Sequence, residues 1–217
     1  MNLEDIHNLP GKLPKTVDIN GRDEYFNSVV LLLLIPVDGE YHIVLEKRAG
    51  NIRQGGEISL PGGKREPDEP IETTALRETA EEIGLCPEDI KIIGRLDTVI
   101  APLGIIVDVF VGVTEVSFSQ LKPNPTEVEK LFTVPVSFFK QTVPEEYAVM
   151  VKVHPSFINE ETGKEEVLFP SAELNIPPKY CTPWGKLHNK IYVYKTEGEV
   201  IWGITARVIK DFTSRIA

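Results

Sequence analysis

Three glutamates that could bind a cation, Glu78, Glu81 and Glu82, lie close together in a segment that predicts a helix over residues 70–83. At about 100° per residue, Glu82 lies about 40° from Glu78, and Glu81 lies about 60° from Glu78 in the opposite sense. All three carboxylates therefore project from one side of the expected helix. The other side carries a packing stripe of Leu76, Thr79, Ala80 and Ile83.

This clustering breaks two local rules of helix stability. Glu78 and Glu82 are stacked at i and i+4, which costs about 0.2–0.5 kcal/mol for a like-charged pair. The carboxylates also lie in the C-terminal half of the helix, where the macrodipole disfavours negative charge. Two explanations are open: a solvated acidic face, or a site for Mg²⁺ or Mn²⁺, which bind carboxylate oxygens and commonly share their remaining positions with substrate phosphates.

The residues around this helix follow a fixed spacing. The pattern is G-x5-E-x7-R-E-U-x-E-E-x-G-U, where U is a bulky aliphatic residue, and its fixed positions here are Gly63, Glu69, Arg77, Glu78, Glu81, Glu82 and Gly84. It resembles the Nudix box, and the chain thus resembles the Nudix hydrolase family. One departure is Thr79 at the first U position, where it is expected to cost some core contact and to leave metal chemistry unaffected.

The resemblance implies a fold, a reaction and a set of roles. The fold is α/β, an α/β/α sandwich around a mixed β-sheet. The reaction is Mg²⁺- or Mn²⁺-dependent hydrolysis of a diphosphate bond in a nucleoside derivative. Arg77 is expected to pair with Glu69 and hold the preceding loop against the helix. The implied metal ligands are Glu78, Glu81, Glu82 and the backbone carbonyl of Gly62.

The general base is left open by the resemblance. It is either a glutamate of the box, such as Glu81, or an acidic residue from a later loop. Glu127 and Glu129, in the segment NPTEVEKLFTVP, are the candidates in that loop. Glu69 could alternatively help to position the attacking water.

The segment before the box indicates a substrate. Residues 45–64, LEKRAGNIRQGGEISLPGGK, resemble a signature of the coenzyme A pyrophosphatase branch, L-L-T-x-R-S-x3-R-x3-G-x3-F-P-G-G. Arg48, Arg53, Gly56 and residues 61–63 match in order. The spacing from Arg53 to Gly56 is one residue short, and Ala49 and Leu60 replace the serine and the phenylalanine of the signature.

This second resemblance implies that the substrate is coenzyme A or an acyl-CoA. Arg48, Arg53 and Lys64 could bind its phosphate groups. Two other readings are open. One is a Nudix hydrolase for ADP-ribose, a dinucleoside polyphosphate or a (deoxy)nucleoside triphosphate, and the other is a non-catalytic Nudix-like binding module.

The rest of the chain predicts strands interleaved with a few helices. The expected strands are 27–35, 41–48, 91–100, 105–114, 191–195 and 200–202, and Asp38-Gly39 predicts a hairpin turn between the first two. Further helices are expected at 135–140 and 205–216, and the second has an apolar stripe of Val208, Ile209, Phe212 and Ile216. Asp68 is expected to cap the acidic helix and Gly84 to end it. Residues 1–24 predict an arm packed on the domain, and the proline-rich residues 145–190 predict an insertion with a hairpin and a long loop.

The length and composition of the chain limit the classes of protein to which it can belong. The 217 residues suit a single domain over 1–217. A net charge of −10 argues against a general nucleic-acid binder or a binder of anionic membranes, because both need a basic face. Cys86 and Cys181 have no metal-ligand spacing, and the first fifteen residues contain no apolar leader. A cytoplasmic protein is expected, and a homodimer is left open.

Overall fold

The computed structural model describes residues 7–16 and 18–216. Its helices are α2 (Ile71–Ile83), α3 (Val136–Gln141) and α4 (Gly203–Arg215). Its strands are β1 (Phe26–Val37), β2 (Glu40–Arg48), β3 (Ile58–Ser59), β4 (Gly62–Lys64), β5 (Lys91–Arg95), β6 (Val99–Ala101), β7 (Ile105–Val113), β8 (Val128–Pro135), β9 (Glu145–Val153), β10 (Ser156–Ile158), β11 (Glu165–Val167), β12 (Trp184–Lys195) and β13 (Val200–Trp202).

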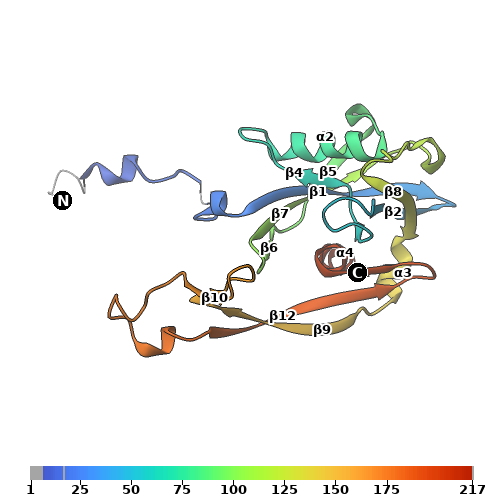
Figure 1. Cartoon of the computed structure of the whole chain (residues 1–217). Coiled ribbons are helices and arrows are strands. Elements are labelled where there is room, and N and C mark those ends of the chain that lie inside the picture. Colours follow the sequence, from blue (N-terminus) through green and yellow to red (C-terminus); the bar gives the residue numbers. More distant parts are fainter. Residues whose placement is uncertain (1–6, 17, 217) are drawn as a thin grey trace.

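An eight-stranded mixed sheet forms the centre of the molecule (Figure 1). Its main order is β3-β2-β1-β7-β5, with β4 also paired to β1, β6 to β7 and β8 to β2. Strand β1 runs parallel to β7 and antiparallel to β2 and β4. The predicted hairpin turn is confirmed: Asp38 and Gly39 both have positive φ, and Val37 pairs with Glu40.

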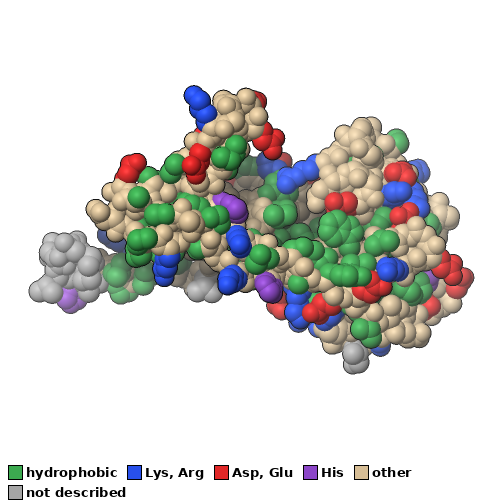
Figure 2. Space-filling view, turned by 60° about the horizontal axis from the view of Figure 1, so that its bottom comes forward, with side chains coloured by type: hydrophobic (Ala, Val, Ile, Leu, Met, Phe, Trp, Pro, Cys, Tyr) green, Lys and Arg blue, Asp and Glu red, His purple; other side chains and the backbone are tan. Residues whose placement is uncertain are grey.

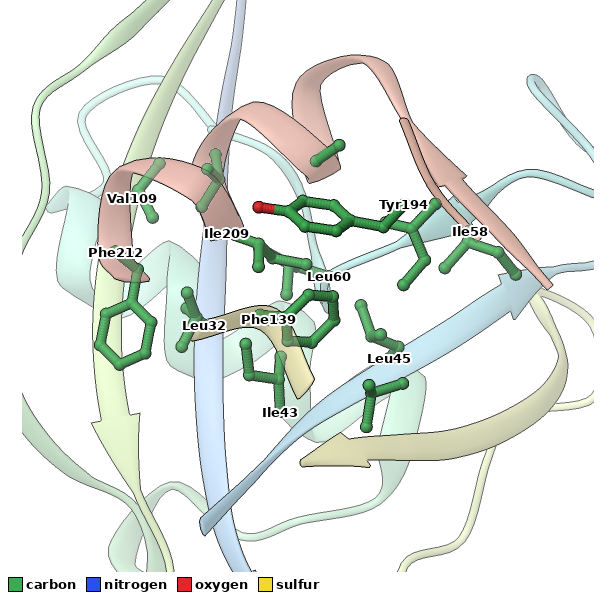
Figure 3. Packing of buried hydrophobic residues seen from close by; sticks show 14 of the residues in the cluster. Leu32, Ile43, Leu45, Ile58, Leu60, Val109, Phe139, Tyr194, Ile209 and Phe212 are labelled. Carbon is green, nitrogen blue, oxygen red and sulfur yellow. The ribbon is translucent and has the colours of Figure 1, made fainter. Parts of the chain in front are cut away.

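Helices cover both faces of this sheet. Leu31 and Leu33 of β1 pack with Ile83 of α2 on one face. Alternate residues such as Leu32 pack with α3 and α4 on the other face (Figure 3). There the rings of Phe139 and Tyr194 meet edge to face, with their centroids 5.1 Å apart. Because successive side chains of a strand point to opposite faces, the continuous apolar run of β1 serves both cores. The expected α/β/α sandwich is confirmed.

Several elements differ from their expected bounds. Strand β8 was missed, because its charged residues obscure the alternation that a half-buried strand normally shows. The strand expected at 91–100 is divided into β5 and β6, and the interruption lets the Thr98 hydroxyl donate to buried Asp108 at 2.7 Å. In α4 the predicted stripe is confirmed at Val208, Ile209 and Phe212 but is wrong at Ile216, which is 40% exposed.

Residues 145–190 contribute β9, the first part of β12 and the β10–β11 hairpin. Strands β9 and β12 form a second, three-stranded sheet with β13, in the order β13-β12-β9. Strand β12 begins at Trp184, well before the expected residue 191. The sequence did not predict its first part because residues 184–190 are mostly exposed and lack the apolar pattern of a core strand. Figure 2 views the molecule from the side of this sheet and shows apolar side chains at its surface. Those exposed on β9 and β12 include Tyr147, Val149, Met150 and Leu187.

The N-terminal arm does not pack on the domain within residues 7–16, all of which are exposed. Figure 1 shows this arm extending away from the sheet. The large apolar residues of this segment, Leu9 and Leu13, offer too little apolar surface to bind it to the domain. The arm joins the domain at Arg22, whose Nη1 donates to Asp108 at 3.0 Å. Among the described residues, no helix is long and apolar enough to cross a membrane.

Candidate active site

Helix α2 carries the acidic cluster and ends as predicted. Gly84 takes the left-handed conformation (φ 69°), and its N–H donates to the carbonyl oxygen of Ala80 at 3.0 Å. The predicted cap at Asp68 is wrong, because the N-cap residue is Pro70 and no side chain caps the helix. Asp68 has φ 60° and belongs to the turn that precedes the helix.

The Arg77 guanidinium binds three carboxylates at once. Its Nε and Nη2 donate to the two carboxylate oxygens of Glu69 at 2.9 and 3.0 Å. Its Nη1 donates to Glu78 Oε1 at 2.8 Å and to Glu81 Oε2 at 3.2 Å. The expected pairing with Glu69 is therefore present, and it ties the loop before α2 to the helix. The hydrogen bonds from Arg77, and one from the Thr74 hydroxyl, lower the pKa of Glu69 to about 2.

We expect Arg77→Lys to destabilise the protein by about 1–2 kcal/mol, because an ammonium group cannot make the two parallel hydrogen bonds to Glu69. Urea denaturation in EDTA would measure the change in the free energy of unfolding. Arg215→Lys is the matched control, since Arg215 pairs with Asp97 and Asp211 at the surface, and its expected effect is below about 0.5 kcal/mol. Equal losses in the two variants would contradict the structural role of Arg77.

Glu82 is buried and does not belong to a solvated face. It is 4% exposed, and its Oε2 accepts the backbone N–H of Gly62 at 2.7 Å. Burial raises the pKa of Glu82 to about 9, and the negative charge of Glu46 adds to this effect. Glu81, in contrast, is exposed. A harmless solvated acidic face therefore cannot account for the whole cluster.

Glu46 belongs to this site and was missed by the sequence analysis. It lies on β2 directly opposite Ser59 of β3, it is fully buried, and its Oε1 accepts the Ser59 hydroxyl at 2.9 Å. Burial raises the pKa of Glu46 to about 7. A signal was available: when Arg48 is aligned with the arginine of L-L-T-x-R, Glu46 stands where that signature has threonine. Alternation also puts it on the same face as Val44, which packs in the core under α2.

The two glycines of β4 let the backbone lie against the acidic helix. Gly62 has φ 147°, which L side chains rarely adopt, and a Cβ there would collide with the backbone of β1. A Cβ on Gly63 would collide with the carboxylate of Glu78. Glycine at both positions therefore permits the contact between β4 and the carboxylates of Glu78 and Glu82.

The structure separates the two candidates for the general base. Glu127 lies close enough to Glu46 and Glu78 for its negative charge to add to the rise in pKa that burial causes in both. Glu129 lies on β8 and pairs with Lys47 at 3.2 Å. Because Lys47 follows Glu46 on β2, the two side chains point to opposite faces of the strand. Glu127 thus lies on the side of the acidic cluster, and Glu129 lies with Lys47 on the other side.

The three predicted substrate-binding cations occupy different environments. Arg48 is partly buried, with Nη1 at 3.8 Å from Glu46 Oε1 and 4.0 Å from Glu82 Oε1. Arg53 lies exposed in the loop after β2, and Lys64 lies exposed at the end of β4. Arg53 and Lys64 are therefore accessible to a ligand, whereas Arg48 lies beside the buried carboxylates.

The cluster has the donor chemistry of a site for a hard divalent cation. Within residues 7–16 and 18–216, no three acidic, histidine or cysteine side chains converge as a ready ligand set. Two observations fit a cation: Glu46 Oε2 is buried without a hydrogen-bond partner, and Arg48 approaches the buried carboxylates of Glu46 and Glu82 no closer than 3.8 Å. Oxygen donors with uncompensated charge are what Mg²⁺ and Mn²⁺ bind. The ligand assignment to Glu78, Glu81, Glu82 and Gly62 stays a prediction.

Without a cation, the protein should lose stability as the pH rises. The folded-state pKa values of Glu82 (about 9) and Glu46 (about 7) both lie above their ordinary value of 4.5, so folding favours the protonated forms. The stabilisation is complete below about pH 4.5 and is lost as the pH rises through the folded-state values. Urea denaturation at several pH values in EDTA should show this decline, and saturating Mg²⁺ should reduce it. A metal-free stability that does not change between pH 5 and about 9 would contradict the burial of these acids as ionisable groups.

The mixed sheet with helices on both faces and the buried acidic site match a known protein family. The profile of the NUDIX domain matches residues 26–153, more than half of the chain. The chain therefore belongs to the Nudix hydrolase family.

Three members of that family are similar to this chain in sequence. The peroxisomal coenzyme A diphosphatase NUDT7 of Mus musculus is 32% identical over 139 residues, which cover 62% of this chain and 58% of that protein. The mitochondrial coenzyme A diphosphatase NUDT8 of Homo sapiens is 34% identical over 125 residues, covering 56% and 53%. The uncharacterized Nudix hydrolase NudL of Photorhabdus laumondii is 26% identical over 205 residues, covering 94% and 89%. The chain thus spans a little more than half the length of the first two relatives.

Proposed function

We propose that this protein is a Mg²⁺- or Mn²⁺-dependent hydrolase that cleaves the diphosphate of coenzyme A or an acyl-CoA. The products would be 4′-phosphopantetheine, or its acyl form, and adenosine 3′,5′-bisphosphate. The observation that carries the proposal is the buried carboxylate of Glu82 against the backbone of Gly62 in a Nudix chain. The choice of coenzyme A is supported by the signature between Arg48 and Gly63 and by the names of two relatives.

The acidic cluster would hold the cation. When bound, the cation supplies neutralisation of phosphate charge and a lowered pKa for a bound water. Arg77 would fix the carboxylates of Glu69, Glu78 and Glu81 through the hydrogen bonds described above. The N–H of Gly62 would orient Glu82 in the same way. The proposed ligands are Glu78, Glu81, Glu82 and the carbonyl of Gly62.

Glu127 would accept the proton of the attacking water. It is half-buried and lies on the side of the cluster, near Glu78. Its backbone carbonyl accepts the N–H of Ala49 at 2.8 Å, which fixes its turn to the end of β2. A carboxylate carried on a fixed turn beside the site is suited to general-base catalysis.

Cationic side chains would bind the phosphate groups of the substrate. Coenzyme A carries a 3′-phosphate besides its diphosphate, and the exposed side chains of Arg53 and Lys64 could donate to them in a protein of net charge −10. Arg48 would link this loop to the cluster, because its Nε donates to the carbonyl oxygen of Arg53 at 3.2 Å.

A substrate panel tests the proposal. The protein would be incubated with coenzyme A, acetyl-CoA, ADP-ribose, a dinucleoside polyphosphate and a deoxynucleoside triphosphate, each with Mg²⁺ or Mn²⁺. We expect the highest kcat/KM for coenzyme A or its acyl form, with adenosine 3′,5′-bisphosphate as a product by mass spectrometry. Faster turnover of ADP-ribose or another member of the panel would assign a different Nudix substrate. Metal-dependent turnover of none would point to a binding module.

A further inference from the structure

We infer that Glu46, which lies outside the Nudix box, is a further ligand for the divalent cation and forms with Glu82 the buried side of its site. The inference rests on the proposed function for the presence of the cation. It assigns a role to a strand residue at a position where the coenzyme A signature has threonine.

The first support is an unsatisfied oxygen. Backbone pairing with β3 sets Glu46 opposite Ser59, and the Ser59 hydroxyl donates to Oε1 at 2.9 Å. The second oxygen, Oε2, is buried and has no hydrogen-bond partner in the part of the chain that the structure describes, and the whole residue is 0% exposed. A buried carboxylate oxygen without a partner is costly, so a group that binds there is expected.

The second support is that no cationic side chain among the described residues forms a hydrogen bond with this oxygen. The Nη1 atom of Arg48 lies 3.8 Å from Oε1 of Glu46, beyond hydrogen-bonding distance, and it approaches the oxygen that Ser59 already serves. The same Nη1 lies 4.0 Å from Glu82 Oε1. Arg48 therefore marks the two carboxylates as neighbours, but at these distances it donates a hydrogen bond to neither of them.

The third support is that both carboxylates are held in place. Glu82 is fixed by the N–H of Gly62, and Glu46 by Ser59. Mg²⁺ is usually bound in proteins by one or two carboxylates, with waters and substrate phosphates at the remaining positions. The fixed pair of Glu46 and Glu82 meets this requirement on the buried side of the proposed site.

A manganese titration of the full chain tests the inference. Free Mn²⁺ would be followed by electron paramagnetic resonance, and the thermal midpoint would be measured with and without Mn²⁺. Glu46→Gln keeps the size of the side chain and an acceptor for Ser59 but removes the charge. We expect the Kd for Mn²⁺ to rise about tenfold or more, the metal-free midpoint to stay equal or rise, and the increase caused by Mn²⁺ to shrink.

Glu199→Gln is the matched control. Glu199 is also a mostly buried acid, but it pairs with Lys130 at 2.6 Å, so its substitution should lower the metal-free midpoint and leave the Kd for Mn²⁺ unchanged. Equal Kd values for wild type and Glu46→Gln would overturn the inference and leave Glu46 as a structural acid. Should Glu46→Gln fail to fold, Glu46→Thr decides, because it also removes the carboxylate and introduces the residue that the signature has at this position. A folded Glu46→Thr variant with the wild-type Kd again overturns the inference. A wild-type protein that binds no Mn²⁺ would overturn the proposed function itself.

Discussion

Glu82→Gln is expected to lower kcat on the preferred diphosphate by at least about a hundredfold, while the protein stays folded. The substitution removes a negative charge that the cation needs, yet the amide oxygen can still accept the N–H of Gly62. Without metal, the variant should be as stable as the wild type or more stable, because a buried charge with a strongly raised pKa is gone. Steady-state kinetics and urea denaturation in EDTA would measure both effects.

The control for this prediction lies on the same helix. Glu72 is exposed in the first turn of α2, so Glu72→Gln should leave kcat unchanged. A folded Glu82→Gln protein that turns over at nearly the wild-type rate would remove Glu82 from the metal site. If Glu82→Gln lowers the stability in EDTA, the charge of Glu82 is compensated within the protein and does not need a cation.

Substitutions at the two glycines of β4 should have different effects, one on catalysis and the other on stability. Gly63→Ala would place a methyl group where the carboxylate of Glu78 lies, and that carboxylate is the end of a flexible side chain that can move. We expect a folded protein whose kcat falls by about a hundredfold, because the displacement of one group by about 1 Å can cost that much. Wild-type kcat in this variant would mean that the position of Glu78 does not matter for turnover.

Gly62→Ala should lower the stability of the protein. Its methyl group would meet the backbone of Val29 and Val30, which cannot move without distorting the central strand, and φ at this position is 147°. We expect a loss of about 3 kcal/mol or more in the free energy of unfolding, measured by urea denaturation. If Gly62→Ala is as stable as Gly63→Ala, the close approach of β4 to β1 is not rigid.

Features set by neighbouring residues could be predicted from the sequence. The Asp38-Gly39 turn, the stop at Gly84 and the period of α2 depend on local backbone preferences, which single residues reveal. The pairing of Arg77 with Glu69, which the resemblance to the Nudix box implies, is present. The α/β/α arrangement followed from the same resemblance and is confirmed.

Features set by distant partners could not be predicted in this way. The environment of Glu46 is formed by Ser59 of β3, which pairs with β2, and by the nearby carboxylate of Glu82 on α2, and neither of them is a sequence neighbour of Glu46. The sequence shows Glu82 as one of three acids on a helix, whereas its contact with Gly62 is a tertiary one. Strand β8 and the long strand β12 were missed or shortened because their exposed positions hide the alternation of a strand.

The central claim is that a divalent cation neutralises the buried acids of this site. Anomalous diffraction from crystals soaked with Mn²⁺ and a non-hydrolysable diphosphate ligand would test it most directly. The account predicts a manganese peak in contact with the carboxylate of Glu82, with the diphosphate completing its coordination. Well-diffracting crystals with no manganese beside Glu82 would contradict it.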